Sequence, residues 1–295
     1  MIRASLTNDI IFKLVFGTEK RERILRALLN AILGLKGPAR ITRLAILNPT
    51  LDTAHALDKR CILDIKARDG RGRRFNIEVQ VSQDPDYLKR SLYYLTSLFS
   101  EQLQSGDGYD EITKVVSLSF VDYVLFPEQE SLHSVYRLYD EENKTKFPDV
   151  LELHYIELSK FNKDQPQKLR SRFERWLHIL KFAEFYRDQD SPIPDKLLQD
   201  KEVVMALETY RQVSSSQEVR QLLLSREMAE RDRITSLKRA YKEGKLEGKL
   251  EGKLEGELKG KLEGKLEAAQ VMLSLGIDQA TVCEKLGLNP EDLNR

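Results

Sequence analysis

Helix-like and strand-like patterns of apolar residues alternate along the first two thirds of the chain. Residues 19–33 carry apolar side chains with the spacing of an amphipathic helix, and glycines follow. Similar helical patterns recur at residues 84–103 and 167–186. Runs typical of strands occupy residues 41–47, 60–67, 74–81, 113–126, 134–139 and 150–158. The alternation predicts a three-layer α/β domain that ends near residue 190.

From about residue 212 the pattern becomes a low-complexity repeat. Glycine recurs at every fourth position from Gly244 to Gly264, and leucine from Leu246 to Leu266, with Lys and Glu between them. As a helix, the repeat would lose about 1 kcal/mol at each glycine relative to alanine and would place like charges one turn apart. As a strand, it would place every Leu and Gly on one face. The pattern predicts either a tail that associates with other copies of the chain or a flexible spacer.

We divide the remaining sequence into three parts. Residues 191–240 are expected to form a helical connector, residues 241–267 the repeat, and residues 268–295 a small helical hairpin. The hairpin resembles a miniature helix-turn-helix, but Lys285 and Arg295 are its only cations. Packing or partner binding is therefore favoured over reading of DNA.

Charge and cysteine content exclude several classes of protein. The 295 residues include 48 Lys and Arg against 47 Asp and Glu, a net charge of +1, so any DNA contact needs a local patch. Only Cys61 and Cys283 are cysteines and the four histidines are scattered, which argues against a disulfide scaffold or a zinc cluster. The N-terminus lacks a signal-peptide layout, and no apolar run approaches the ~20 residues that cross a bilayer. We expect a soluble, cytoplasmic protein.

The candidate chemistry lies on two neighbouring predicted strands joined by a glycine-containing turn. Side chains alternate faces along a strand, so Asp64 and Ile65 point to opposite faces, as do Ile77 and Glu78. A hairpin centred on Arg71 pairs apolar face with apolar face and sets Ile65 opposite Ile77. The same register places Asp64 directly opposite Glu78, and a one-residue slip would move both carboxylates into the core.

Two carboxylates that face each other across a hairpin repel, because their Cβ atoms are only ~4.5–5.5 Å apart. A divalent cation such as Mg²⁺ would compensate, since it takes oxygen ligands and commonly uses one or two carboxylates together with phosphate oxygens. Alternatively, Lys66, Arg73 or Arg74 neutralises the pair on a solvated face of the sheet. The residues alone leave both interpretations open.

The succession of Asp64 and then Glu78, Val79 and Gln80 resembles the core of PD-(D/E)XK nucleases, in the variant where Gln replaces the usual Lys. Further matching motifs are NDIIFKLVFG at residues 8–17, RSLYY at 90–94, EQLQSG at 101–106, IELSKF at 156–161 and the Glu-Gly-Lys tail. Together they are similar to the recombination-promoting nuclease family, also described as PD-(D/E)XK transposase-like proteins, over residues 5 to about 190. The resemblance implies an α/β core with a central mixed sheet flanked by helices, followed by a low-complexity helical tail.

The resemblance also implies an activity, that of a divalent-metal-dependent DNA endonuclease that promotes recombination. Asp64 and Glu78 would hold Mg²⁺ or another divalent cation, assisted by the Val79 carbonyl. Gln80 stands where a Lys normally orients the attacking water and offsets phosphate charge, and Gln carries no charge. Lys66 is either a replacement cation or an ordinary surface lysine.

Other positions have two interpretations each. Asp9 is either an extra metal-binding carboxylate or a helix N-cap. Gln102 either contacts a DNA phosphate or lies on the surface, and Tyr94 is expected in the core. A basic cluster lies on the hairpin and comprises Arg68, Arg71, Arg73 and Arg74. It is suited to DNA phosphates of any base sequence, or it is a solvated turn.

A second functional hypothesis keeps the fold but not the chemistry. In it, the protein is a catalytically weak or inactive DNA-binding and assembly module that forms homo-oligomers through its C-terminal repeat. Gln80 in place of Lys, the near-zero net charge and the repeat favour this hypothesis.

Overall fold

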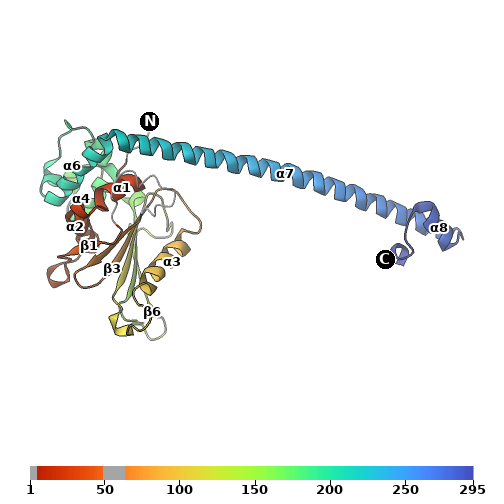
Figure 1. Ribbon diagram of the computed structural model, residues 1–295, viewed down its shortest axis with the longest axis horizontal. Coiled ribbons are helices and arrows are strands. Elements are labelled where there is room, and N and C mark those ends of the chain that lie inside the picture. The colour runs from red at the N-terminus through yellow and green to blue at the C-terminus, as the bar shows by residue number, and fades with distance from the viewer. Residues whose placement is uncertain (1–4, 49–63, 295) are drawn as a thin grey trace. The chain divides into compact units, whose positions relative to one another are not determined.

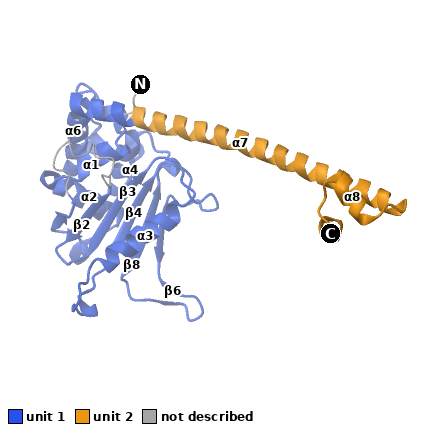
Figure 2. Cartoon of the chain, turned by 45° about the vertical axis from the view of Figure 1, so that its right-hand side comes forward, with its two compact units in different colours: residues 1–226 blue, residues 227–295 orange. Residues whose placement is uncertain are grey.

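The structure is a computed structural model that describes residues 5–48 and 64–294. The chain divides into two compact units, which meet between Arg226 and Glu227 (Figure 2). The first unit contains the sheet and most of the helices. The second contains most of one long helix and a short C-terminal helix.

A six-stranded mixed sheet forms the centre of the first unit, in the order β1-β2-β3-β4-β8-β5 (Figure 1). β1 pairs with β2, and β2 with β3, in the antiparallel direction. β4 lies parallel to both β3 and β8, and β5 is antiparallel to β8. The strands are β1 Leu44–Ile46, β2 Ile65–Asp69, β3 Arg74–Gln80, β4 Val115–Val121, β5 His133–Arg137 and β8 Leu151–Glu157. A separate small hairpin pairs β6, Tyr139–Asp140, with β7, Thr145–Lys146. The predicted α/β fold with a mixed sheet is confirmed.

The larger core lies between one face of the sheet and a group of helices. These helices are α1 Asp9–Phe16, α2 Glu22–Ile32, α4 Arg172–Phe182, α5 Asp195–Leu198 and α6 Lys201–Ser215. Phe75 and Ile77 of β3, Phe12 of α1 and Trp176 of α4 all lie in this core and are almost fully buried. Each such side chain contributes about 1.5–3 kcal/mol relative to its exposed state, so this face firmly fixes the position of β3.

Helix α3, Tyr87–Ser100, covers the opposite face of the sheet (Figure 1). Leu95 and Leu98 of α3 pack on Val115 of β4, and Tyr87 packs with Val121 near the other end of the same strand. β4 is buried along its whole length, as expected for a strand covered on both faces. The polar side chains of β3 therefore lie between the sheet and a helix.

The register of the β2–β3 hairpin agrees with the prediction. Ile65 pairs with Ile77 and Ala67 with Phe75. Asp64 directly precedes β2, so the same register continued by one residue sets it opposite Glu78. The turn contains Gly72 at φ +83°, a conformation that other residues rarely adopt. The first residues of the predicted strand 60–67, up to residue 63, lie outside the described residues.

Helices after residue 190 belong to the first unit. Val203, Leu207 and Tyr210 of α6 are fully buried in the larger core. The domain boundary expected near residue 190 therefore falls inside this unit, because α6 has an apolar face that packs against the N-terminal helices α1 and α2 and against α4. The helix that follows, α7, spans Gln217–Ser274, and its first ten residues also belong to the first unit.

The repeat forms part of the continuous helix α7. Its leucines Leu246, Leu250, Leu254 and Leu258 are each about 61% exposed. Apart from the neighbouring residues and the backbone of α7 itself, no atom of the described residues lies within 4 Å of a Cβ placed on any of the repeat glycines. Of the two periods that the sequence allowed, the helical one is adopted. In the described part of the chain the repeat leucines are exposed, and they form a stripe that turns by about 40° from one repeat to the next.

A short helix follows α7 in the second unit. Gly276, at φ +85°, follows the end of α7, and α8 spans Gln279–Leu286 with Asp278 as its N-cap. Ala269, Val282 and Leu288 form a small core between the two helices. Within residues 5–48 and 64–294, no helix combines the length and apolarity required to cross a membrane.

Candidate active site

Two carboxyl groups meet at the end of β3. Glu78 is 5% exposed, and its side chain forms a hydrogen bond with that of Asp64. Asn76 Nδ2, from the same face of β3, donates to Glu78 Oε1 at 2.8 Å. The Tyr87 hydroxyl of α3 donates to Glu78 Oε2 at 3.3 Å. The hairpin register and α3 together orient both oxygens of Glu78.

Burial dominates the electrostatics of the pair. It raises the pKa of Asp64 to about 8, assisted by the charge of Glu78 and opposed by Lys13 and Arg90. Burial also raises the pKa of Glu78, against the hydrogen bonds from Asn76 and Asp64. Without a bound cation, the two carboxyl groups therefore share a proton near neutral pH.

One interpretation of the sequence assumed that the face of the β2–β3 hairpin with Asp64 and Glu78 is solvated. The structure shows that this face is covered. Asn76 and Glu78 are both buried, because α3 covers them. Lys66 forms an ion pair with Glu101 at 3.2 Å, and Arg73 with Asp69 at 2.7 Å. The charges that act on Asp64 come instead from helices α1 and α3.

Gln80 lies at the end of β3 and is held by two hydrogen bonds. Its Nε2 donates to the Ser82 carbonyl at 2.8 Å, and its Oε1 accepts from Arg90 Nη2 at 3.2 Å. The guanidinium of Arg90 also forms an ion pair with Asp84 and lies 5.2 Å from the centre of the Tyr87 ring. A cation from α3 thus contacts the position where these nucleases usually carry a Lys.

Asp9 is not brought to the carboxyl pair. Its Oδ2 lies 3.0 Å from Arg226 Nη2. The N-cap of α1 is Asn8, whose side chain accepts from the backbone N–H groups of Ile10 and Ile11, so the expectation that Asp9 is the cap is wrong. In the described part of the chain, no group of three or more His, Cys, Asp or Glu side chains could hold a metal ion. Among the described residues, Asp64 and Glu78 are therefore the two carboxylates that an ion at the pair would have.

Gln102 performs a structural task instead of lying free at the surface. Its Nε2 donates to the Thr113 carbonyl, and its Oε1 accepts from the Thr113 backbone N–H, all at 3.0 Å. The Thr113 hydroxyl also donates to Oε1 at 2.7 Å. Because both the nitrogen and the oxygen of its amide are engaged, Gln102 joins the end of α3 to the start of β4, and this geometry favours a structural role over the expected phosphate contact.

We expect Gln102→Ala to destabilise the protein. The change leaves partly buried backbone groups of Thr113 unpaired, which costs about 1–3 kcal/mol. Urea unfolding measures the loss, and Gln104→Ala, at an exposed glutamine, is the matched control. If Gln102 instead contacted a DNA phosphate, the variant would unfold like the wild type and would bind a DNA duplex more weakly.

The basic cluster lies at the other end of the hairpin. β3 runs from Arg74 to Gln80, so the turn is separated from Glu78 by about 13 Å of strand. Arg71 donates to the Pro38 carbonyl, and Arg73 to Asp69 and the Ala39 carbonyl. A DNA contact by Arg71, Arg73 and Arg74 stays a prediction, at a distance from the carboxyl pair.

Three residues near the pair were not assigned from the sequence: Lys13, Tyr87 and Arg90. Lys13 on α1 is only 5% exposed. Its side chain lies beside Gly17, together with that of Ile65. A Cβ placed on Gly17 would be about 3 Å from both Lys13 Cγ and Ile65 Cγ1. The sequence did offer a sign that Lys13 is buried near other charged groups, because it is a charged residue inside the apolar run of α1. The positions of Tyr87 and Arg90 depend on how α3 docks, which no local pattern shows.

Tyr94 lies at the rim of the site and not in the core as expected. It is 36% exposed, and its neighbour Tyr93 is 67% exposed. Burial, followed by the charges of Asp64 and Glu78, raises the pKa of Tyr94.

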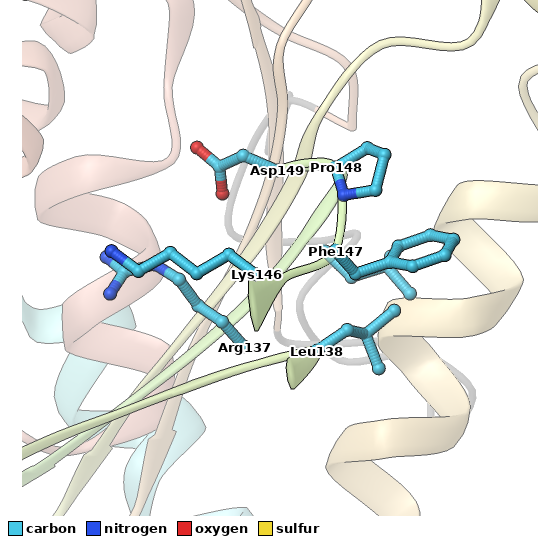
Figure 3. A pocket seen from close by; sticks show the side chains of 7 residues that line it. Arg137, Leu138, Lys146, Phe147, Pro148 and Asp149 are labelled. Carbon is cyan, nitrogen blue, oxygen red and sulfur yellow. The ribbon is translucent and has the colours of Figure 1, made fainter. Parts of the chain in front are cut away.

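A surface pocket of about 350 Å³ lies away from this site (Figure 3). It is lined by Arg137, Leu138, Lys146, Phe147, Pro148, Asp149 and Leu151. Leu151 begins β8 and pairs with the first residue of β4, whereas Glu78 pairs with Ser119 near the end of β4. The pocket and the carboxyl pair therefore lie towards opposite ends of the strands.

The mixed sheet and the facing carboxyl groups at the end of a central hairpin strand define a PD-(D/E)XK-type α/β fold. The family model of the PD-(D/E)XK nuclease family transposases matches residues 6–240, and the chain belongs to this family. The resemblance inferred from the sequence is confirmed, and the match continues beyond residue 190 through α6 into α7. No curated protein and no solved structure is significantly similar to the chain.

Proposed function

We propose that this protein is a divalent-metal-dependent DNA endonuclease that hydrolyses phosphodiester bonds and promotes recombination in the cytoplasm. The observation that supports the proposal is the buried Asp64–Glu78 pair at the end of β3. Two carboxyl groups forced together in a low-dielectric site share a proton or a cation, and a site of this kind binds cations strongly when the proton leaves. Membership of a nuclease family makes DNA the expected substrate.

The residues present fit a hard divalent cation such as Mg²⁺. Asp64 and Glu78 would hold it, with the Val79 carbonyl as a further oxygen ligand. Asn76 and Tyr87 already orient Glu78 through hydrogen bonds, which is the support that metal-binding carboxylates commonly have. When bound, such a cation lowers the pKa of a water ligand and stabilises negative charge on a phosphate. Gln80 would orient the attacking water through its amide.

A plasmid-cleavage assay across a metal series tests the proposal. Supercoiled DNA is incubated with the protein and Mg²⁺, Mn²⁺, Ca²⁺ or EDTA, and relaxed and linear products are followed on a gel. We expect cleavage with Mg²⁺ or Mn²⁺ and none with EDTA. Absence of cleavage with every metal would contradict the proposed function.

One observation favours a second function, that of a catalytically weak or inactive DNA-binding module. Gln80 is uncharged, and both ends of its amide are engaged within the protein. DNA binding that needs no metal, together with the absence of cleavage in the same metal series, would support this alternative.

We further propose that the C-terminal repeat joins copies of the chain into a homo-oligomer. Lys precedes and Glu follows most of the repeat leucines, so the exposed leucine face of α7 is flanked by opposite charges. A second copy can bury this face and oppose Lys with Glu.

We expect the double variant Leu250→Gln and Leu254→Gln to lower the oligomer number in sedimentation velocity. The change removes apolar area from the centre of the repeat. Leu275→Gln, at an exposed leucine outside the repeat, is the control. Wild-type protein that sediments as a monomer at micromolar concentration would contradict this proposal.

A further inference from the structure

In the proposed active site, Gln80 stands at the position where PD-(D/E)XK nucleases usually carry a Lys. In the proposed function, Asp64 and Glu78 would hold a divalent ion that offsets their charge, and the scissile phosphate would bring a further negative charge that the site has to stabilise. Gln80 offers an amide at this place but no charge. The cation that faces the phosphate must therefore come from another element of the fold.

Three cations lie near the carboxyl pair in the described part of the chain, and their environments differ. Lys66 is paired with Glu101. Lys13 is 5% exposed and packs against the start of β2, so it is enclosed within the fold. The side chain of Arg90 is 37% exposed, and its guanidinium contacts Gln80. Arg90 alone combines contact with the Gln80 position and access from solvent.

Arg90 is also fixed in place. Tyr87, three residues earlier on α3, donates to Glu78, and the Arg90 guanidinium lies over the Tyr87 ring at 5.2 Å. Asp84 and Gln80 hold two of its nitrogens. A guanidinium has several N–H donors in a planar fork that matches phosphate oxygens, so donors remain beyond these two bonds. The charge of Arg90 lowers the pKa of both Asp64 and Glu78, which agrees with its proximity to the pair.

We propose that Arg90 binds the scissile phosphate diester of DNA and supplies the positive charge that Gln80 lacks. This inference rests on the proposed nuclease function. In it, Asp84 and Gln80 orient the guanidinium, and a non-bridging phosphate oxygen accepts from its remaining N–H groups. The site is then assembled from β3 and α3 together, and not from the hairpin alone.

The first experiment compares cleavage by the full-length wild type, Arg90→Gln and Arg90→Lys with Mg²⁺. We expect kcat to fall by about 10²–10³-fold in Arg90→Gln, the loss typical of one donor to a developing negative charge. Arg90→Lys keeps the charge and is expected to recover most of this loss. Lys89→Gln is the control, because it removes a cation from the neighbouring position of α3. The Lys89 side chain is 87% exposed and pairs with Asp86, so this variant should cleave like the wild type.

The second experiment measures the salt dependence of binding to a short DNA duplex in Ca²⁺. Loss of one phosphate contact lowers the slope of log K against log salt concentration by about one. We expect this decrease in Arg90→Gln and not in Arg90→Lys, with unchanged circular dichroism. A purely structural role for Arg90 would leave the slope unchanged.

The outcomes separate this inference from the function on which it rests. If the wild-type protein fails to cleave DNA with every metal tested, the proposed function is contradicted. The salt dependence of DNA binding still reports, in that case, whether Arg90 contacts phosphate. Cleavage by Arg90→Gln at the wild-type rate overturns the inference. It is also overturned if Arg90→Lys is as impaired as Arg90→Gln and the salt slope of neither variant changes.

Discussion

Asp64→Asn is expected to lower Mg²⁺-dependent DNA cleavage by about 10³-fold or more. The neutral side chain leaves Glu78 as the one carboxylate for the cation, and the cation provides several kcal/mol of stabilisation to the developing charge, where each 1.4 kcal/mol is a factor of ten in rate. Glu78→Gln should have a similar effect, because the two carboxylates act on the same ion. Initial rates of plasmid cleavage measure both losses.

Both variants should remain folded. Asn and Gln have the shapes of Asp and Glu, and the buried pair loses one like charge. Glu101→Gln is the matched control, since it removes a half-exposed carboxylate that is paired with Lys66 and not with Glu78. If Asp64→Asn cleaves as fast as the wild type while it remains folded, the carboxyl pair is not the catalytic site.

The stability of the metal-free protein is expected to fall as the pH rises from 7 to 8. Burial and the neighbouring Glu78 raise the pKa of Asp64 to about 8. In the unfolded chain, Asp64 titrates near its ordinary value of 3.8, so between these values the folded state holds a proton that the unfolded state releases. The stabilisation is complete at low pH and is lost as the pH passes through 8. The slope is at most about 1.4 kcal/mol per pH unit for one proton.

The window above pH 7 separates this effect from that of the buried histidines. Burial, and then His154, lowers the pKa of His133 to about 4, so this histidine makes stability rise with pH only up to about its ordinary value of 6.5. Urea unfolding in EDTA at pH 7 and 8 measures the remaining slope. Asp64→Asn should flatten it, and Mg²⁺ should stabilise the wild type more at pH 8 than at pH 7. An equal slope in wild type and Asp64→Asn would show that Asp64 is not the titrating group.

The hairpin that carries the site could be predicted because its information is local. Apolar and polar side chains alternate on both strands around a turn with Gly72, and one register alone puts Ile65 on Ile77. That register also sets Asp64 against Glu78. One of the two interpretations of this face, that it is solvated, was wrong because α3 covers it, and the alternation on the strands does not show where a helix docks.

Contacts outside the hairpin decided the structural roles of Gln102 and Asp9. Gln102 and Asp9 each have the right chemistry for a site, but Gln102 is engaged by Thr113, and Asp9 by Arg226. The period-4 repeat fits both a helix and a strand, so its pattern could not choose between them.

By itself, the sequence determined the α/β class, the hairpin, its register and the meeting of two acids, since all of these follow from the periodicity of neighbouring residues and from turn chemistry. Only the tertiary structure decided that the acids are buried, that their pKa values rise, and that Lys13 and Arg90 are the cations beside them. The reason is physical: burial and electrostatic environment depend on which helices dock on a strand, and docking joins residues that no sequence period connects.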